Sequence, residues 1–134
     1  MSFNLHVKKD VLCTKESQWE IYTHGGRNQT GIDAVKWASY LSDLGAGELL
    51  VTSMDRDGTK KGYDLDLLRA IRTQCSRPII ASGGAGSLKD IVDALKDIDA
   101  ALLASLLHFQ EVTITDIKKT MIKHNLPARI LQTL

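Results

Sequence analysis

Two apolar segments of this sequence each end in a turn that contains glycine and polar residues. Segment 48–54 leads into the turn 55–59, and segment 78–82 leads into the turn 83–86. Strands of α/β folds carry their functional groups where parallel strands end. The backbone N–H groups of a glycine-containing turn before a helix can also bind a phosphate. The two turns therefore predict an α/β protein that binds a phosphorylated substrate.

Strand and helix patterns alternate along the chain, as they do in repeated βα units on a parallel sheet. We count four such units. The strands are predicted at 3–7, 48–54, 78–82 and 100–104. The helices are predicted at about 33–44, from 64, from 87 and at about 115–124. A short hairpin inserted after the first strand is predicted to pair 11–13 with 19–23.

The length of the chain limits how this sheet can close. Eight βα units close a barrel in typically about 250 residues, and this chain has 134. We therefore expect an α/β fold that is a (βα)4 half of a TIM barrel, with a four-stranded parallel sheet and helices outside. Such a sheet exposes apolar edges and a face, which predicts an oligomer or a missing half. An open flavodoxin-type sheet with helices on both faces is the alternative.

Several residues signal where the predicted helices begin and end. Gly45 supplies a left-handed stop for the first helix, and Asp64 is a natural N-cap for the second. Ser87 begins the third helix, with Asp90 in the position of a weak capping box. Pro127 follows the last helix and prevents its continuation.

Composition excludes several classes of function. A hydrophobic content of 43% in 134 residues allows one domain core, so we expect residues 1–134 to form a single domain. The formal net charge of +1 offers no basic stripe for nucleic acid. No apolar run approaches the roughly 20 residues of a membrane span, and the chain does not begin like a signal peptide, so we expect a cytoplasmic protein. Cys13 and Cys75 lack metal-ligand spacing, and we interpret them as ordinary thiols.

The motifs closely resemble those of one family, the cyclase subunit of imidazole glycerol phosphate synthase. The matching stretches are 22–26, 30–31, 45–48, 52–64, 80–86 and 101–105, together with His108 and Phe109. The resemblance begins at about Leu5 and agrees in order, spacing and identity at three strand ends, which makes it highly specific. It covers only the C-terminal half of the family's barrel.

This resemblance implies a function as well as a fold. The family's barrel joins ammonia from a glutaminase subunit to a ribotide with a phosphate at each end, phosphoribulosyl-formimino-aminoimidazole carboxamide ribotide. The products are imidazole glycerol phosphate, for histidine biosynthesis, and aminoimidazole carboxamide ribotide, and the lyase needs no metal or organic cofactor. The chain is then expected to bind one phosphate and to be inactive until a missing N-terminal half or self-association completes it.

Two alternatives stay open at this point. The chain is a non-catalytic, phosphate-binding or structural half-barrel, or it is a fragment of the related phosphoribosyl isomerase, which shares the half-barrel plan and the phosphate site. The stretch 54–59 followed by 61–64 favours the cyclase.

Asp57 matches the catalytic aspartate of the family's second half, where a carboxyl group at a strand end can transfer protons. The competing interpretation is that Asp57 caps the turn with Gly58. We interpret Asp55 and Arg56 as supporting residues. The family pattern has another aspartate where this chain has His6, which can transfer protons near neutral pH but is larger and can be cationic.

The resemblance also assigns binding residues. Those expected to hold a substrate phosphate are Gly58, Gly83, Gly84, Ala104 and Ser105. Thr52 and Ser82 are predicted substrate contacts, although hydroxyls at strand ends often bond only to nearby backbone. Glu48 matches a position in the ring of charges that gates ammonia at the opposite mouth of the barrel, and its other interpretation is a solvated charge at a strand start.

Overall fold

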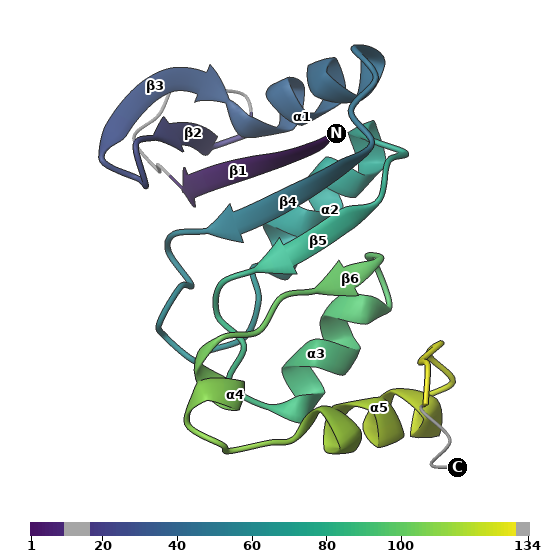
Figure 1. Ribbon diagram of the computed structural model, residues 1–134. Helices are drawn as coiled ribbons and strands as arrows, with labels where there is room; N and C mark the ends of the chain where they lie inside the picture. The colour runs from purple at the N-terminus through teal and green to yellow at the C-terminus, as the bar shows by residue number, and fades with distance from the viewer. Residues whose placement is uncertain (10–16, 131–134) are drawn as a thin grey trace.

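The computed structural model describes residues 1–9 and 17–130, and in them six strands form one mixed sheet in the order β3-β2-β1-β4-β5-β6 (Figure 1). The parallel part consists of β1 (Ser2–Lys9), β4 (Glu48–Ser53), β5 (Ile79–Ser82) and β6 (Ala100–Ala101). Antiparallel neighbours extend it beyond β1, namely β2 (Trp19–Thr23) and β3 (Asn28–Asp33). The chain is therefore a mixed α/β fragment compatible with part of a TIM barrel.

The sheet is wider than the four parallel strands that the sequence predicts, because the β2–β3 hairpin extends it, and β3 was not predicted. Strand β2 pairs with β1 on one side and with β3 on the other, and the segment 11–13 predicted to pair with it lies outside the described residues. The buried Glu20 of β2 joins the hairpin, because its carboxylate accepts hydrogen bonds from the Gly31 backbone N–H and the Gln29 side-chain amide. The carboxylate thus connects β2 to β3 through polar contacts, which a search for alternating apolar residues does not detect.

Five helices occur within the described ranges. They are α1 (Ala34–Asp43), α2 (Leu65–Gln74), α3 (Leu88–Leu95), α4 (Ser105–His108) and α5 (Ile114–Lys123). The predicted caps are confirmed at Asp64 and Ser87, and Gly45 follows α1 with a φ of +95°. None of these helices has the length and apolar composition needed to cross a bilayer.

The capping box predicted for α3 is only half formed. The Ser87 hydroxyl accepts from the Asp90 backbone N–H at 3.2 Å, but the Asp90 carboxylate accepts from the Gly86 N–H at 2.9 Å. A complete capping box begins α5 instead, where Thr113 and Asp116 each bond to the other's backbone N–H. The Asp90 carboxylate thus stabilises the loop before its helix.

The last predicted strand, 100–104, is cut short after Ala101. The Leu102 N–H still bonds to the Ala81 carbonyl, but the Leu102 carbonyl accepts from the buried Tyr63 hydroxyl at 2.8 Å. The Tyr63 hydroxyl thus takes the place of a neighbouring strand as the hydrogen-bond partner of the Leu102 carbonyl. The chain then turns toward α4.

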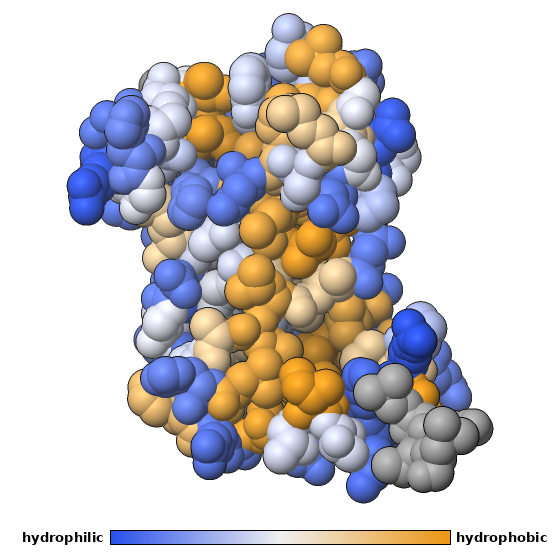
Figure 2. All heavy atoms as spheres, viewed as in Figure 1, coloured by the Kyte–Doolittle hydropathy of each residue, from blue (hydrophilic) through white to orange (hydrophobic). Residues whose placement is uncertain are grey.

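The register divides the sheet into two different faces. Leu5, Val51 and Ala81 form one row of the buried face, over which α1, α2 and α3 pack. In Figure 1, α2 lies behind β4 and β5, and Figure 2 shows a band of apolar side chains down the opposite face. Leu50 and Ile80 are neighbours on that half-buried face. Since the described helices cover one face, the alternative of an open sheet with helices on both faces is not observed.

Candidate functional site

The loops that follow β4, β5 and β6 meet at one edge of the sheet, where they line a small cavity of about 50 Å³. The cavity brings together most of the predicted site residues, namely Asp57, Gly58, Ser82, Gly83, Gly84, Ala104 and Ser105. It is also lined by Lys60, Ala85 and Leu102, which the sequence analysis did not assign to a site. Lys60 could have been considered from the sequence, because it is a cationic residue directly after the turn that contains Asp57.

The glycines of the β5–α3 loop are needed where this loop touches the β4–α2 loop. Gly84 has a φ of +111°, and a Cβ atom there would lie 2.2 Å from the Gly62 carbonyl oxygen. The Gly62 N–H donates to the Gly84 carbonyl at 2.8 Å. A Cβ atom on Gly86 would lie 2.0 Å from the Lys60 carbonyl oxygen. Close packing of the two backbones is therefore sufficient to explain why glycine is needed at these positions, whether or not a ligand binds. The same packing holds the walls of the cavity in place.

Asp57 occupies an exposed turn at the mouth of the cavity. Its N–H donates to the Ser53 carbonyl at 3.0 Å, and the turn is closed by the Thr59 hydroxyl and N–H, which both donate to the Arg56 carbonyl. Within the described residues, no side chain or N–H donates a hydrogen bond to the Asp57 carboxylate. The carboxylate is therefore available to a ligand rather than used to cap its own turn.

Comparison with known proteins shows the family of this chain. A family model described as "Histidine biosynthesis protein" matches residues 4–113. The chain belongs to this family. The imidazole glycerol phosphate synthase subunit HisF of Methanococcus maripaludis strain C6 is 57% identical over 125 residues, which are 90% of this chain and 46% of the relative. The subunits HisF of Prochlorococcus marinus strain NATL1A and Lactococcus lactis subsp. cremoris strain SK11 are 53% and 51% identical over 118 residues, 87% of this chain and 46% of each relative. The chain thus spans about half the length of the curated relatives that it matches.

Two predicted residues, His6 and Thr52, lie beside the cavity but do not line it. The register aligns His6 of β1 with Thr52 of β4, and Thr52 with Ser82 of β5, so the three share one row on the open face. The Thr52 hydroxyl lies 3.4 Å from the Asn4 side-chain oxygen, to which it donates. Because Ser82 lines the cavity, the row extends from the cavity to His6.

Glu48 is separate from this group. It begins β4 opposite Ser2 of β1, at the other edge of the sheet. Ser53 lies five positions further along the extended strand, a distance of about 16 Å. Glu48 therefore cannot touch a ligand bound in the cavity.

Asp55 and Arg56 stabilise the loops around the cavity. The Asp55 carboxylate accepts from the Lys9 N–H at 2.6 Å and so joins the ends of β4 and β1. The Arg56 guanidinium donates to the Lys61 carbonyl at 3.2 Å within its own loop. Both contacts agree with the supporting role expected for these residues.

Tyr63 is a positioning residue that the sequence analysis missed. It is 4% exposed, and its hydroxyl bond to the Leu102 carbonyl holds the β6–α4 loop against the β4–α2 loop. Burial, together with the negative charge of Asp90, raises the pKa of the Tyr63 hydroxyl, which therefore stays protonated and donates at neutral pH. The sequence feature that could have indicated this role is the presence of a large aromatic residue inside a predicted loop.

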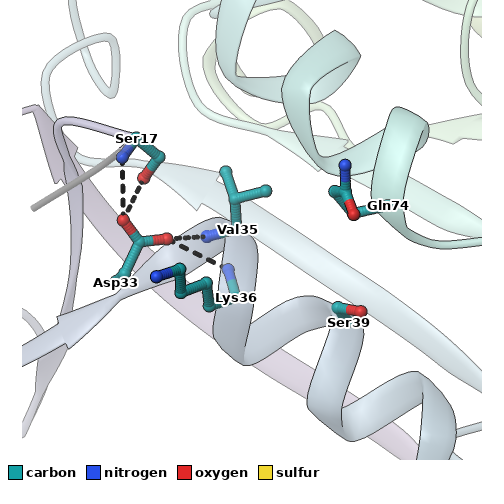
Figure 3. A pocket seen from close by; sticks show the side chains of 6 residues that line it. All are labelled: Ser17, Asp33, Val35, Lys36, Ser39 and Gln74. Carbon is teal, nitrogen blue, oxygen red and sulfur yellow. Dashed lines mark hydrogen bonds between the residues drawn. The ribbon is translucent and has the colours of Figure 1, made fainter.

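A larger cavity of about 340 Å³ lies at the start of α1 and contains none of the predicted site residues (Figure 3). Its Asp33 carboxylate accepts from the Val35 and Lys36 N–H groups and from both the N–H and hydroxyl of Ser17. Partial burial raises the pKa of Asp33, but these hydrogen bonds outweigh it and lower the pKa overall. Asp33 thus serves as the cap of α1. Among the described residues, no group of three or more histidine, cysteine or acidic side chains could hold a metal.

Proposed function

We propose that this chain is the C-terminal half of an imidazole glycerol phosphate synthase cyclase and folds as a (βα)4 half-barrel. The observation that carries the proposal is the cavity, in which loops after three parallel strands bring Asp57, the β5–α3 glycines and Ser105 together. The relatives are imidazole glycerol phosphate synthase subunits about twice as long as the matched segment, which supports the same function.

One substrate phosphate binds in the cavity. Its oxygens accept hydrogen bonds from the backbone N–H groups of Gly58, Gly83 and Gly84 and from the Ser105 hydroxyl. Backbone N–H groups before a helix attract anions because the helix dipole and unpaired donors act together. The phosphate anchors the substrate so that its reacting part extends along the row formed by Ser82, Thr52 and His6.

Asp57 acts as the general acid or base of the cyclisation. Ring closure with ammonia requires protons to be removed from the attacking nitrogen and delivered to leaving groups, and a carboxylate beside the bound substrate can do both. His6 lies in the same row as Thr52 and Ser82, where an imidazole can hold or release a second proton near neutral pH. No metal or cofactor takes part in the proposed reaction.

The active protein contains a second half. The open sheet face carries Leu50 and Ile80, and β6 offers only two residues to a neighbouring strand. A missing N-terminal half covers this face and supplies the site for the substrate's other phosphate. A glutaminase subunit supplies ammonia at the opposite edge, where Glu48 contributes to the entry.

A second candidate function is a phosphate-binding half-barrel without catalysis. His6 favours it, because the resembled family has a carboxylate at this position and an imidazole is a larger group with different charge. The named relatives are synthase subunits, which favours the cyclase over a fragment of phosphoribosyl isomerase.

Calorimetric titration of the whole chain with inorganic phosphate tests the binding site. We expect Ser105→Ala to weaken phosphate binding about tenfold, since a hydrogen bond to a charged group is lost. Ser87→Ala serves as a matched control, because Ser87 caps α3 outside the cavity lining. Equal affinity in the Ser105→Ala variant and the wild type would remove the proposed site.

A further inference from the structure

The cavity contains one cation and one acid beside its uncharged donors. Among the described residues that line it, Lys60 is the only one with a cationic side chain and Asp57 the only one with an acidic side chain. A phosphate dianion beside the Asp57 carboxylate is repelled by it, so nearby positive charge is needed to offset the repulsion. Lys60 is the residue in place to supply that charge.

The backbone of Lys60 is fixed while its side chain is only loosely held. Its φ is +55°, an uncommon conformation for a residue other than glycine. Its carbonyl oxygen packs closely on Gly86. The ammonium group, by contrast, forms an ion pair with Glu111 and lies 5.6 Å from the centre of the Phe109 ring. Both side chains of the ion pair are about 40% exposed, and such pairs contribute little stability.

We propose that Lys60 is a phosphate-binding residue whose ammonium group exchanges Glu111 for the substrate phosphate. The proposal rests on the proposed function, because it assigns a charge and a competing partner to the same phosphate site. The exchange is favourable because a dianion attracts the ammonium group more strongly than the single charge of Glu111 does. Glu111 keeps the ammonium group beside the cavity and, by competing for it, weakens phosphate binding.

The test is a calorimetric titration of the whole chain with inorganic phosphate at low ionic strength. We expect Lys60→Met to weaken binding about fivefold, because it keeps the aliphatic stem and removes only the charge. Lys61→Met removes the same charge from the next residue, which does not line the cavity, and is expected to change affinity less than about twofold. Lys60→Arg should retain most of the affinity, since it keeps the charge.

Glu111→Gln distinguishes competition from simple attraction. We expect this variant to bind phosphate about twofold more tightly than the wild type, since Lys60 no longer has a charged competitor. The double variant Lys60→Met/Glu111→Gln should bind like Lys60→Met alone, because the effect of Glu111 acts through Lys60. Circular dichroism spectra of each variant verify that the fold is kept.

The outcomes separate this inference from the proposed function. Equal loss in Lys60→Met and Lys61→Met, or a Glu111→Gln effect that persists without Lys60, would overturn the role of Lys60. If Ser105→Ala still weakens binding in that case, the phosphate site stands without Lys60. A wild-type chain that binds no phosphate would overturn both.

Discussion

Replacing Gly84 with alanine tests the claim that two loops packed backbone to backbone form the walls of the cavity. A Cβ atom there would lie 2.2 Å from the Gly62 carbonyl oxygen and 2.9 Å from the Arg56 Cβ atom. Alanine at a φ of +111° costs about 1–3 kcal/mol of backbone strain. Separating the loops weakens the Gly62–Gly84 hydrogen bond by about 1 kcal/mol, and overpacking adds about 1–3 kcal/mol. The expected loss of unfolding free energy is therefore about 3–7 kcal/mol.

Gly25→Ala is the matched control for this substitution. Gly25 also has a positive φ, +65°, but a Cβ atom there meets no atom within 4 Å, so its expected cost is about 1–2 kcal/mol. Urea unfolding at a fixed protein concentration compares the two variants, with the m-value checked for each. A Gly84→Ala variant already unfolded in buffer also agrees with the expectation. Equal losses in the two variants would refute the close packing of the loops.

Three further substitutions test other parts of the account. Tyr63→Phe should lower the free energy of unfolding by about 1–3 kcal/mol in urea, because the Leu102 carbonyl loses its partner; no loss would show that this bond does not hold the loops. Asp33→Ala should cost about 1 kcal/mol at pH 7 and less at pH 3. The reason is that folding lowers the Asp33 pKa from 3.8, so its contribution is complete above that value and is lost as the pH falls below it; a cost independent of pH would contradict the cap. His6→Asp should raise the ammonia-dependent turnover of a completed barrel, and unchanged turnover would remove His6 from the catalytic site.

Local signals were sufficient for most elements of the fold. The N-caps Asp64 and Ser87 and the stop at Gly45 depend on side chains and backbone angles within one turn, so the sequence alone locates them. The β2–β3 hairpin depends on Glu20, whose partners lie on the next strand. The early end of β6 depends on Tyr63, which lies 39 residues away in the sequence. Contacts of this kind are made only by the folded chain.

The candidate site likewise has some features that the sequence predicts and others that only the folded structure reveals. Asp57, Gly83, Gly84 and Ser105 could be predicted because each follows a recognisable strand, and parallel strands bring their carboxyl ends together. The packing of Gly84 against Gly62 could not be predicted, because it joins two loops whose shapes the sequence does not specify. Any substitution at Gly84 would therefore disturb the fold as well as a phosphate site, so Ser105→Ala is the cleaner test of phosphate binding.

Cyclase turnover tests the central claim most directly, namely that this chain is an inactive half of a cyclase. The loss of absorbance of the formimino ribotide substrate is followed with excess ammonium salt, first with this chain alone and then with the N-terminal half of the Methanococcus maripaludis relative added. We predict no turnover by the chain alone, turnover by the mixture, and none by a mixture that contains Asp57→Asn. Turnover by the chain alone, or an inactive mixture in which the two halves form a complex, would contradict the account.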